Sequence, residues 1–142
     1  MAPIRTEFVL KLVAHINRKD WWHCPPTDPS AYEKRGKFLA LTFKEAEFWG
    51  RPLDRAQRVT ITSPLIGDEA SIEMELFGHR IPEPNPDTDD VLDWRWDMDA
   101  NIKQAALAKG YDSVVLLAPK AFVALKKQGK IPRSIELNLL KL

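Results

Sequence analysis

The sequence is poor in the residues that build several common kinds of site. Cys24 is its one cysteine, so no disulfide forms within the chain and a reducing cytoplasm is the expected location. Its six glycines are spread widely, which excludes a glycine-rich phosphate loop. No apolar run reaches about eighteen residues, so we expect no membrane-spanning helix. The first residues also lack the basic and apolar regions of a secretory signal.

An excess of positive charge is missing as well. The 142 residues carry a formal net charge of +1, which argues against a broad nucleic-acid-binding surface. Trp94 and Trp96 are flanked by Asp93 and Asp97, whose charges repel phosphate. Nucleic acid is therefore not the expected partner. With 44% hydrophobic and 29% charged residues, the composition is typical of one folded domain.

Candidate metal and nucleophile sites are incomplete. Residues 97–101 read Asp-Met-Asp-Ala-Asn, the first half of a calcium loop, but Ile102 replaces the required Gly and Ala108 the bidentate Glu. His23 and Cys24 have no second pair at zinc-binding spacing. No local signature marks Cys24 as a nucleophile. We predict no metal site.

Hydrophobic periodicity and capping residues predict an α+β domain with mixed, mostly antiparallel sheets and peripheral helices. Thr42 begins a capping box, and Gly50 is expected to end that helix in a left-handed conformation. Asp99 is the expected cap of a later helix. The helices are predicted at 43–49, 68–77, 100–109 and 119–128, and the strands at 37–41, 58–62, 114–117 and 134–139.

Three segments are harder to assign. Residues 6–16 fit a strand by their β-branched content, although Phe8, Val9, Leu12, Val13 and Ile16 also have helical spacing. Residues 17–36 are expected to be a long packed loop, because Pro25-Pro26 excludes regular structure there. Residues 91–98 alternate apolar and polar side chains, which predicts a strand or an extended arm.

Glu136 is the carboxylate of greatest interest. In a strand, Ile135, Leu137 and Leu139 point to one face, while Glu136 and Asn138 point to the other. Glu136 then either faces solvent on an edge strand, beside Arg133, or lies in a cleft where it stabilises developing positive charge.

Four segments together resemble the small ADP-ribosyltransferase-like fold of bacterial toxins and phage effectors, including some anti-CRISPR proteins. That pattern has a first strand ending in His, then a Gly-x-aromatic strand entering a helix, a Gly-aromatic-Asp turn before an apolar strand, and a last strand with a carboxylate. The corresponding segments here are the stretch ending at His15, Gly36-Lys37-Phe38 with the following helix through Trp49, Gly110-Tyr111-Asp112, and the strand of Glu136.

The resemblance implies an enzyme that binds NAD in a cleft between two sheets and breaks the bond from nicotinamide to ribose. It implies that Glu136 holds a ribose hydroxyl and favours the oxocarbenium-like transition state. It also implies that His15 binds the adenosine-side ribose, with His23 as the alternative if residues 6–16 are helical. Tyr32 or Trp49 is the expected partner of the nicotinamide ring, and the Gly36–Phe38 segment is expected to approach the cofactor closely.

Two functions therefore follow from the sequence. The first is a cytoplasmic, NAD-dependent ADP-ribosyltransferase that modifies a macromolecule, with a protein as the expected target. The second is a non-catalytic interaction module, indicated by the tryptophans of residues 91–98 and by six Asp against one Arg in residues 87–99. The pattern has a single acid, Glu136, where two are usual, which favours the second function.

Overall fold

The sheet at the centre of the protein has five strands. The computed structural model describes residues 3–53, 55–88 and 90–141, with the side chain of Trp49 outside the described part. Within these residues the strand order is β1-β2-β5-β4-β3. Neighbouring strands are antiparallel except for the parallel pair of β3 and β4. The strands are β1 (Trp22–His23), β2 (Lys37–Ala40), β3 (Pro64–Gly67), β4 (Ser113–Leu116) and β5 (Glu136–Leu139).

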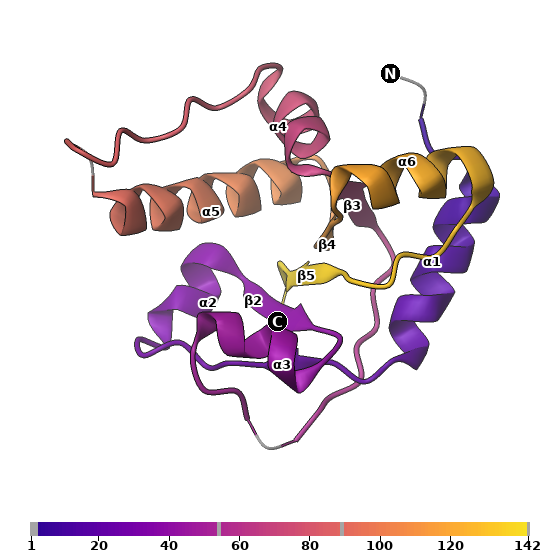
Figure 1. The fold of residues 1–142 in the computed structure, drawn as a ribbon, viewed down its shortest axis with the longest axis horizontal. Helices are drawn as coiled ribbons and strands as arrows, with labels where there is room; N and C mark the ends of the chain where they lie inside the picture. Colours follow the sequence, from indigo (N-terminus) through magenta and orange to yellow (C-terminus); the bar gives the residue numbers. More distant parts are fainter. Residues whose placement is uncertain (1–2, 54, 89, 142) are drawn as a thin grey trace.

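Helices cover both faces of this sheet. Figure 1 shows α1 and α6 side by side at one end of the molecule, with α5 and α4 at the other. The predicted single α+β domain with a mostly antiparallel sheet and peripheral helices is confirmed. The helices are α1 (Thr6–Arg18), α2 (Ser30–Arg35), α3 (Phe43–Ala46), the 3-10 helix η1 (Glu47–Trp49), α4 (Glu69–Phe77), α5 (Val91–Ala108) and α6 (Pro119–Gln128).

Each face of the sheet has its own hydrophobic core. On one face, Leu12 and Ile16 of α1 and Phe122 of α6 pack against Leu39 and Leu137. On the other, α4 and α5 pack against Leu65, Val114 and Leu116. The central strands therefore alternate between two cores, which is why residues 114–117 are apolar on both faces.

The prediction of a strand over residues 6–16 is wrong, because this segment is helix α1. Leu12 and Ile16 are fully buried and lie four residues apart, so helical spacing places both on the core side. Packing of this apolar stripe outweighs the weak β preference of the branched residues.

The strand or arm predicted for residues 91–98 is also wrong, because it forms the first half of α5. The helix begins at Asp90, whose side chain accepts a hydrogen bond from the Asp93 N–H at 3.0 Å. Asp99 is therefore not a cap but lies inside the helix. Trp94 and Met98 are four residues apart and share one side of α5, which the apparent alternation concealed.

Three further predictions need correction. Residues 17–36 contain strand β1 and helix α2, and are not one long loop. Residues 58–62 are not a strand. The N–H and carbonyl of Ile61 form hydrogen bonds with the side chain of Asn17 and not with a neighbouring strand. Gly50 ends η1 with φ 133° and ψ −145°, outside the left-handed helical region.

The Gly110-Tyr111-Asp112 turn leads from α5 into β4 and holds the start of β4 beside the start of β3. The Asp112 carboxylate accepts hydrogen bonds from the backbone N–H groups of Thr62 and Ser63 and from the hydroxyls of Thr62 and Ser113, at 2.8 to 3.2 Å. The turn thus fixes the register of the parallel pair that leads to the centre of the sheet.

Candidate functional site

A small cleft lies between the α4/α5 face of the sheet and these two helices. We call it the acidic cleft, and its enclosed space is about 80 Å³. Its polar and aromatic lining consists of Phe38 on β2, Glu136 and Asn138 on β5, Arg95 and Asp99 on α5, and Glu69 and Glu73 on α4.

The strand register directs these side chains to one face. Glu136 lies opposite Ala40 of β2 and Leu116 of β4, and Asn138 lies opposite Phe38 and Val114. Paired residues of neighbouring strands point to the same face, so Glu136, Asn138 and Phe38 all face α5. Because β5 has a strand on each side, the interpretation of Glu136 as a solvent-facing residue of an edge strand is wrong.

The carboxylates of the cleft are poorly solvated. Burial raises the pKa of Glu136, and the charges of Asp99 and Glu69 add to this effect, whereas Arg95 opposes it. Burial likewise raises the pKa of Asp99, although the positive charge of Arg95 acts to lower it. A half-buried carboxylate with a raised pKa in a cleft is a frequent mark of a functional site.

Arg95 is the cation that balances this cluster. Its guanidinium lies 3.5 Å from Asp99, one helical turn away, and 3.8 Å from Glu69. The Asp99 side chain is 12% exposed, so this pair is shielded from solvent on one side. Among the residues that the structure describes, the Glu136 carboxylate has neither a hydrogen bond nor an ion pair.

Asn138 forms the wall of the cleft next to Glu136. It is 5% exposed, and its Nδ2 donates to the Arg35 carbonyl at 3.0 Å. Its buried Oδ1 has no hydrogen-bond partner in the described part of the chain. That oxygen packs against Gly36, where an added Cβ would lie 2.2 Å from it. Gly36 is therefore required for β2 and β5 to approach closely.

A buried histidine and a half-buried tyrosine form a hydrogen-bonded pair at the edge of the sheet. His23 is 4% exposed, with Nδ1 2.7 Å from the Phe38 carbonyl and Nε2 2.8 Å from the Tyr32 hydroxyl. A carbonyl accepts only, so Nδ1 carries the proton and Nε2 accepts from Tyr32. Burial lowers the pKa of His23, although the hydrogen bond to the Phe38 carbonyl acts in the opposite direction. The lowered pKa favours the neutral form of the ring.

Helix α5 also holds the helix that carries Tyr32. The buried Lys103 donates to the Tyr32 carbonyl at 3.1 Å and to the Glu33 carbonyl. Arg35 stacks on the Trp96 ring, 5.0 Å from its centroid. These contacts fix α2, and therefore Gly36 and β2, relative to the cleft.

The structure brings together only part of the predicted site. Glu136, Gly36 and Phe38 meet at the acidic cleft, and Tyr32 is linked to them through His23. His15 does not join them, because α1 packs on the opposite face of the sheet. Burial, with Lys19 and Arg18, lowers the pKa of His15. The side chain of Trp49 lies outside the described residues.

Residues that the sequence did not reveal complete the cleft. Arg95 and Asp99 were hidden by the apparent alternation of residues 91–98, although their spacing of four residues is that of a helical ion pair. Glu69 lies in the first turn of α4, where an acid is common in any helix and does not mark a site. Asn138 was placed on the same strand face as Glu136, but its amide alone gave no sign of a role.

Neither a metal centre nor a membrane span is present in the described residues. No group of three or more His, Cys, Asp or Glu side chains is arranged to hold a metal ion there. None of the helices in that part combines the length and hydropathy needed to cross a bilayer.

Comparison of the chain with protein-family models, with curated proteins and with solved structures found no match.

Proposed function

We propose that the protein is a cytoplasmic NAD-dependent ADP-ribosyltransferase that modifies another protein, with Glu136 as its catalytic carboxylate. The observation that carries the proposal is a pair of acceptors on one face of β5. Glu136 and Asn138 both line the acidic cleft, and neither the Glu136 carboxylate nor the Asn138 Oδ1 has a donor among the described residues. Glu136 is half-buried and the Asn138 Oδ1 is buried. A buried acceptor without a donor is rare, and a ligand that brings donors to this face of β5 would explain it.

The chemistry of these acceptors fits the ribose end of NAD. Positions i and i+2 of a strand are about 7 Å apart, so the two side chains can take hydrogen bonds from different hydroxyls of one ligand. A carboxylate also stabilises positive charge that develops on a ribose ring. Phe38, on the same face, offers an aromatic ring beside them.

The size of the cleft limits this assignment. Its space of about 80 Å³ is well below the roughly 300–1,000 Å³ of typical ligand pockets. It accommodates a part of the dinucleotide and not the whole. The cleft also lies between one sheet and two helices, and not between two sheets as the resemblance implies.

The residues of the chain have distinct roles in this proposal. NAD, when bound, supplies a glycosidic bond whose cleavage leaves positive charge on the ribose. Glu136 offsets that charge and accepts a ribose hydroxyl, while the surrounding apolar wall limits the access of water. His23, the alternative for the histidine role, has both ring nitrogens in hydrogen bonds, so it acts here by positioning Tyr32 and the backbone of β2.

Nicotinamide release from NAD tests this function without knowledge of the target. We expect the wild-type protein to release nicotinamide slowly in the absence of an acceptor, and Glu136→Gln to reduce that rate at least a hundredfold. Labelled NAD added with a cell lysate should then mark a protein in the presence of wild type only. Glu75→Gln, an exposed acid on α4 outside the cleft, is the matched control and should behave as wild type.

The outcome separates this proposal from its rival. Equal rates for wild type and Glu136→Gln, or no release and no labelling with folded protein, would remove the catalytic function. A non-catalytic interaction module is then the remaining candidate. It is favoured independently by Val91, Leu92 and Trp96, which are large apolar residues exposed on the first half of α5.

A further inference from the structure

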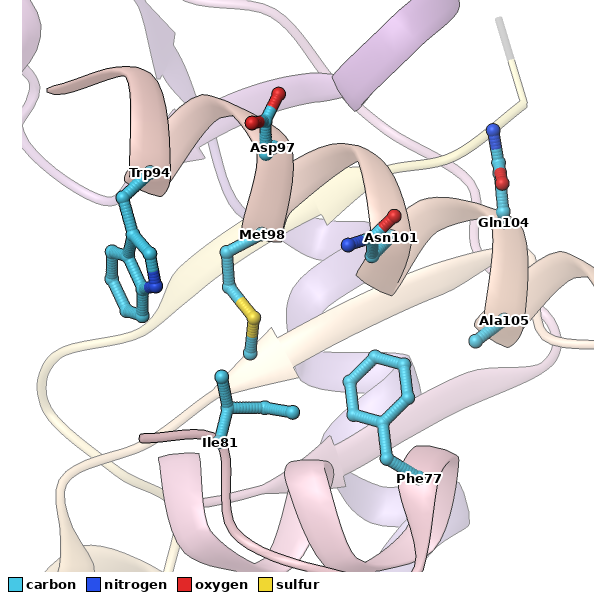
Figure 2. A pocket seen from close by; sticks show the side chains of 8 residues that line it. All are labelled: Phe77, Ile81, Trp94, Asp97, Met98, Asn101, Gln104 and Ala105. Carbon is cyan, nitrogen blue, oxygen red and sulfur yellow. The ribbon is translucent and has the colours of Figure 1, made fainter. Parts of the chain in front are cut away.

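A wide groove runs along the outer side of α5, separate from the acidic cleft. Its volume is about 560 Å³, within the range of ligand-binding pockets. Figure 2 shows Trp94, Met98 and Ala105 of α5 facing Phe77 of α4 and Ile81 of the following loop. Asp97, Asn101 and Gln104 of the lining turn away from this apolar floor and form a polar rim along α5.

The lower wall of the groove is held in place by a buried acid. Glu73 of α4 is 2% exposed, accepts the Ile81 N–H at 2.5 Å and pairs with Arg80 at 3.4 Å. This arrangement directs the chain after α4 back under α5, so Ile81 is presented to the groove. The groove is thus a built feature of the fold and not a gap beside a loose loop.

Acidic residues lie in the groove and in the chain that leads to it. Asp97 is part of its lining, and the exposed residues before it in the chain include Asp93 on α5, the N-cap Asp90, and Asp87 and Glu83 on the loop. The nearby cations are already engaged: Arg95 pairs with Glu69 and Asp99, and Arg80 with Glu73. Such a surface attracts positive charge and repels phosphate.

The groove and the acidic cleft share a wall. Met98 lines both of them. A segment seated in the groove therefore lies against Met98, which also bounds the Glu136 site. This juxtaposition is what an enzyme needs if it is to hold a macromolecular target beside its catalytic group.

We propose that the groove is the docking site for a basic, amphipathic segment of a partner protein. Apolar side chains of that segment pack on Trp94, Met98, Phe77 and Ile81, while its Lys or Arg side chains pair with the acids along α5. This is the helix-in-groove mode of peptide recognition, with apolar anchors and a charged flank. The inference names the partner of the proposed function, but it needs no NAD.

A displayed library of random peptides of about 15 residues, long enough for ~22 Å of helix, tests this proposal. Peptides are selected on the wild-type protein without NAD. We expect the enriched sequences to carry net positive charge and to have apolar residues three or four positions apart. Raised salt should weaken their binding, because the charges are exposed.

Variants of the groove then identify where these peptides bind. Asn101→Arg adds a cation to the exposed rim without disturbing the core, and should reduce affinity at least tenfold. Trp94→Ala should reduce it by a similar factor, with folding checked by circular dichroism. Asp93→Asn combined with Asp97→Asn should cost roughly fivefold. Val123→Ala, an exposed apolar change on α6, is the control.

Several outcomes overturn the proposal. They are enriched peptides that are neutral or acidic, peptides that bind Asn101→Arg and wild type equally, and the absence of any enrichment with folded protein. Preferential binding of a single-stranded oligonucleotide also contradicts it. Because the selection contains no NAD and nicotinamide release needs no partner, failure of one proposal is distinguishable from failure of the other.

Discussion

Gly36→Ala is the substitution that tests the packing of the cleft wall most severely. Gly36 has φ 92° and ψ −169°, a conformation open almost only to glycine. An added Cβ would lie 2.2 Å from Asn138 Oδ1 and 2.8 Å from the Leu139 carbonyl oxygen. The variant is therefore strained in its backbone and also collides with two neighbours, one of which is backbone.

The expected loss of stability follows from these two effects. Backbone strain of this kind costs about 1–3 kcal/mol. Overpacking adds about 1–3 kcal/mol, because the Leu139 carbonyl cannot rotate away. The sum is roughly 2–6 kcal/mol, a large part of the ~5–15 kcal/mol that stabilises a typical domain. A domain of this size should then melt about 5–20 °C lower.

Thermal and urea unfolding of matched variants measure this loss. Gly110→Ala is the control, since Gly110 also has φ 92° but has nothing within 4 Å of its added Cβ. It should lose only the backbone part, about 1–2 kcal/mol. Asn138→Ala removes one of the two colliding groups, so Gly36→Ala should cost less in that background. Equal losses for Gly36→Ala and Gly110→Ala would refute the proposed contact with Asn138.

Three further substitutions test the polar groups. Tyr32→Phe leaves the buried His23 Nε2 without its partner and should cost about 1–3 kcal/mol in urea unfolding; no change would refute this hydrogen bond. Asp112→Ala should cost about 2 kcal/mol near neutral pH. Burial raises the pKa of Asp112, but the hydrogen bonds from Thr62 and Ser113 outweigh burial and lower this pKa from the ordinary aspartate value of 3.8. The stability difference between Asp112→Ala and wild type should therefore shrink as the pH falls below that ordinary value. Glu136→Gln should become more stable relative to wild type as the pH rises above 4.5, because the pKa of Glu136 is raised in the native state and its ionisation therefore destabilises that state. A stability difference that stays constant with pH would contradict this prediction.

Local signals in the sequence were sufficient for much of the fold. The Thr42 capping box, the helix from Pro119 to the glycine at 129 and the strand around Val114 depend on residues close together in the chain, and all three are confirmed. The alternation of side chains along the strand was enough to predict that Glu136 points away from Leu137, because a strand places every second side chain on the same side.

The errors arose where two periodicities coexist in one segment. Apolar and polar residues alternate from Leu92 to Met98, yet Asp90 at the cap and the packing of Met98 decide in favour of a helix. This error concealed part of the site, because Arg95 and Asp99 lie in and just after that segment. The Asn138–Gly36 contact joins residues about a hundred positions apart, and no local pattern encodes such a contact.

The melting temperature of the protein with and without NAD is the most direct test of the proposed function. A ligand that binds only the native state stabilises it by ~2.7 kcal/mol at about 100 times its dissociation constant. We therefore expect a rise of roughly 5–10 °C for wild type at saturating NAD, and a clearly smaller rise for Glu136→Gln. An unchanged melting temperature for folded wild type at millimolar NAD would contradict the assignment of the acidic cleft to NAD.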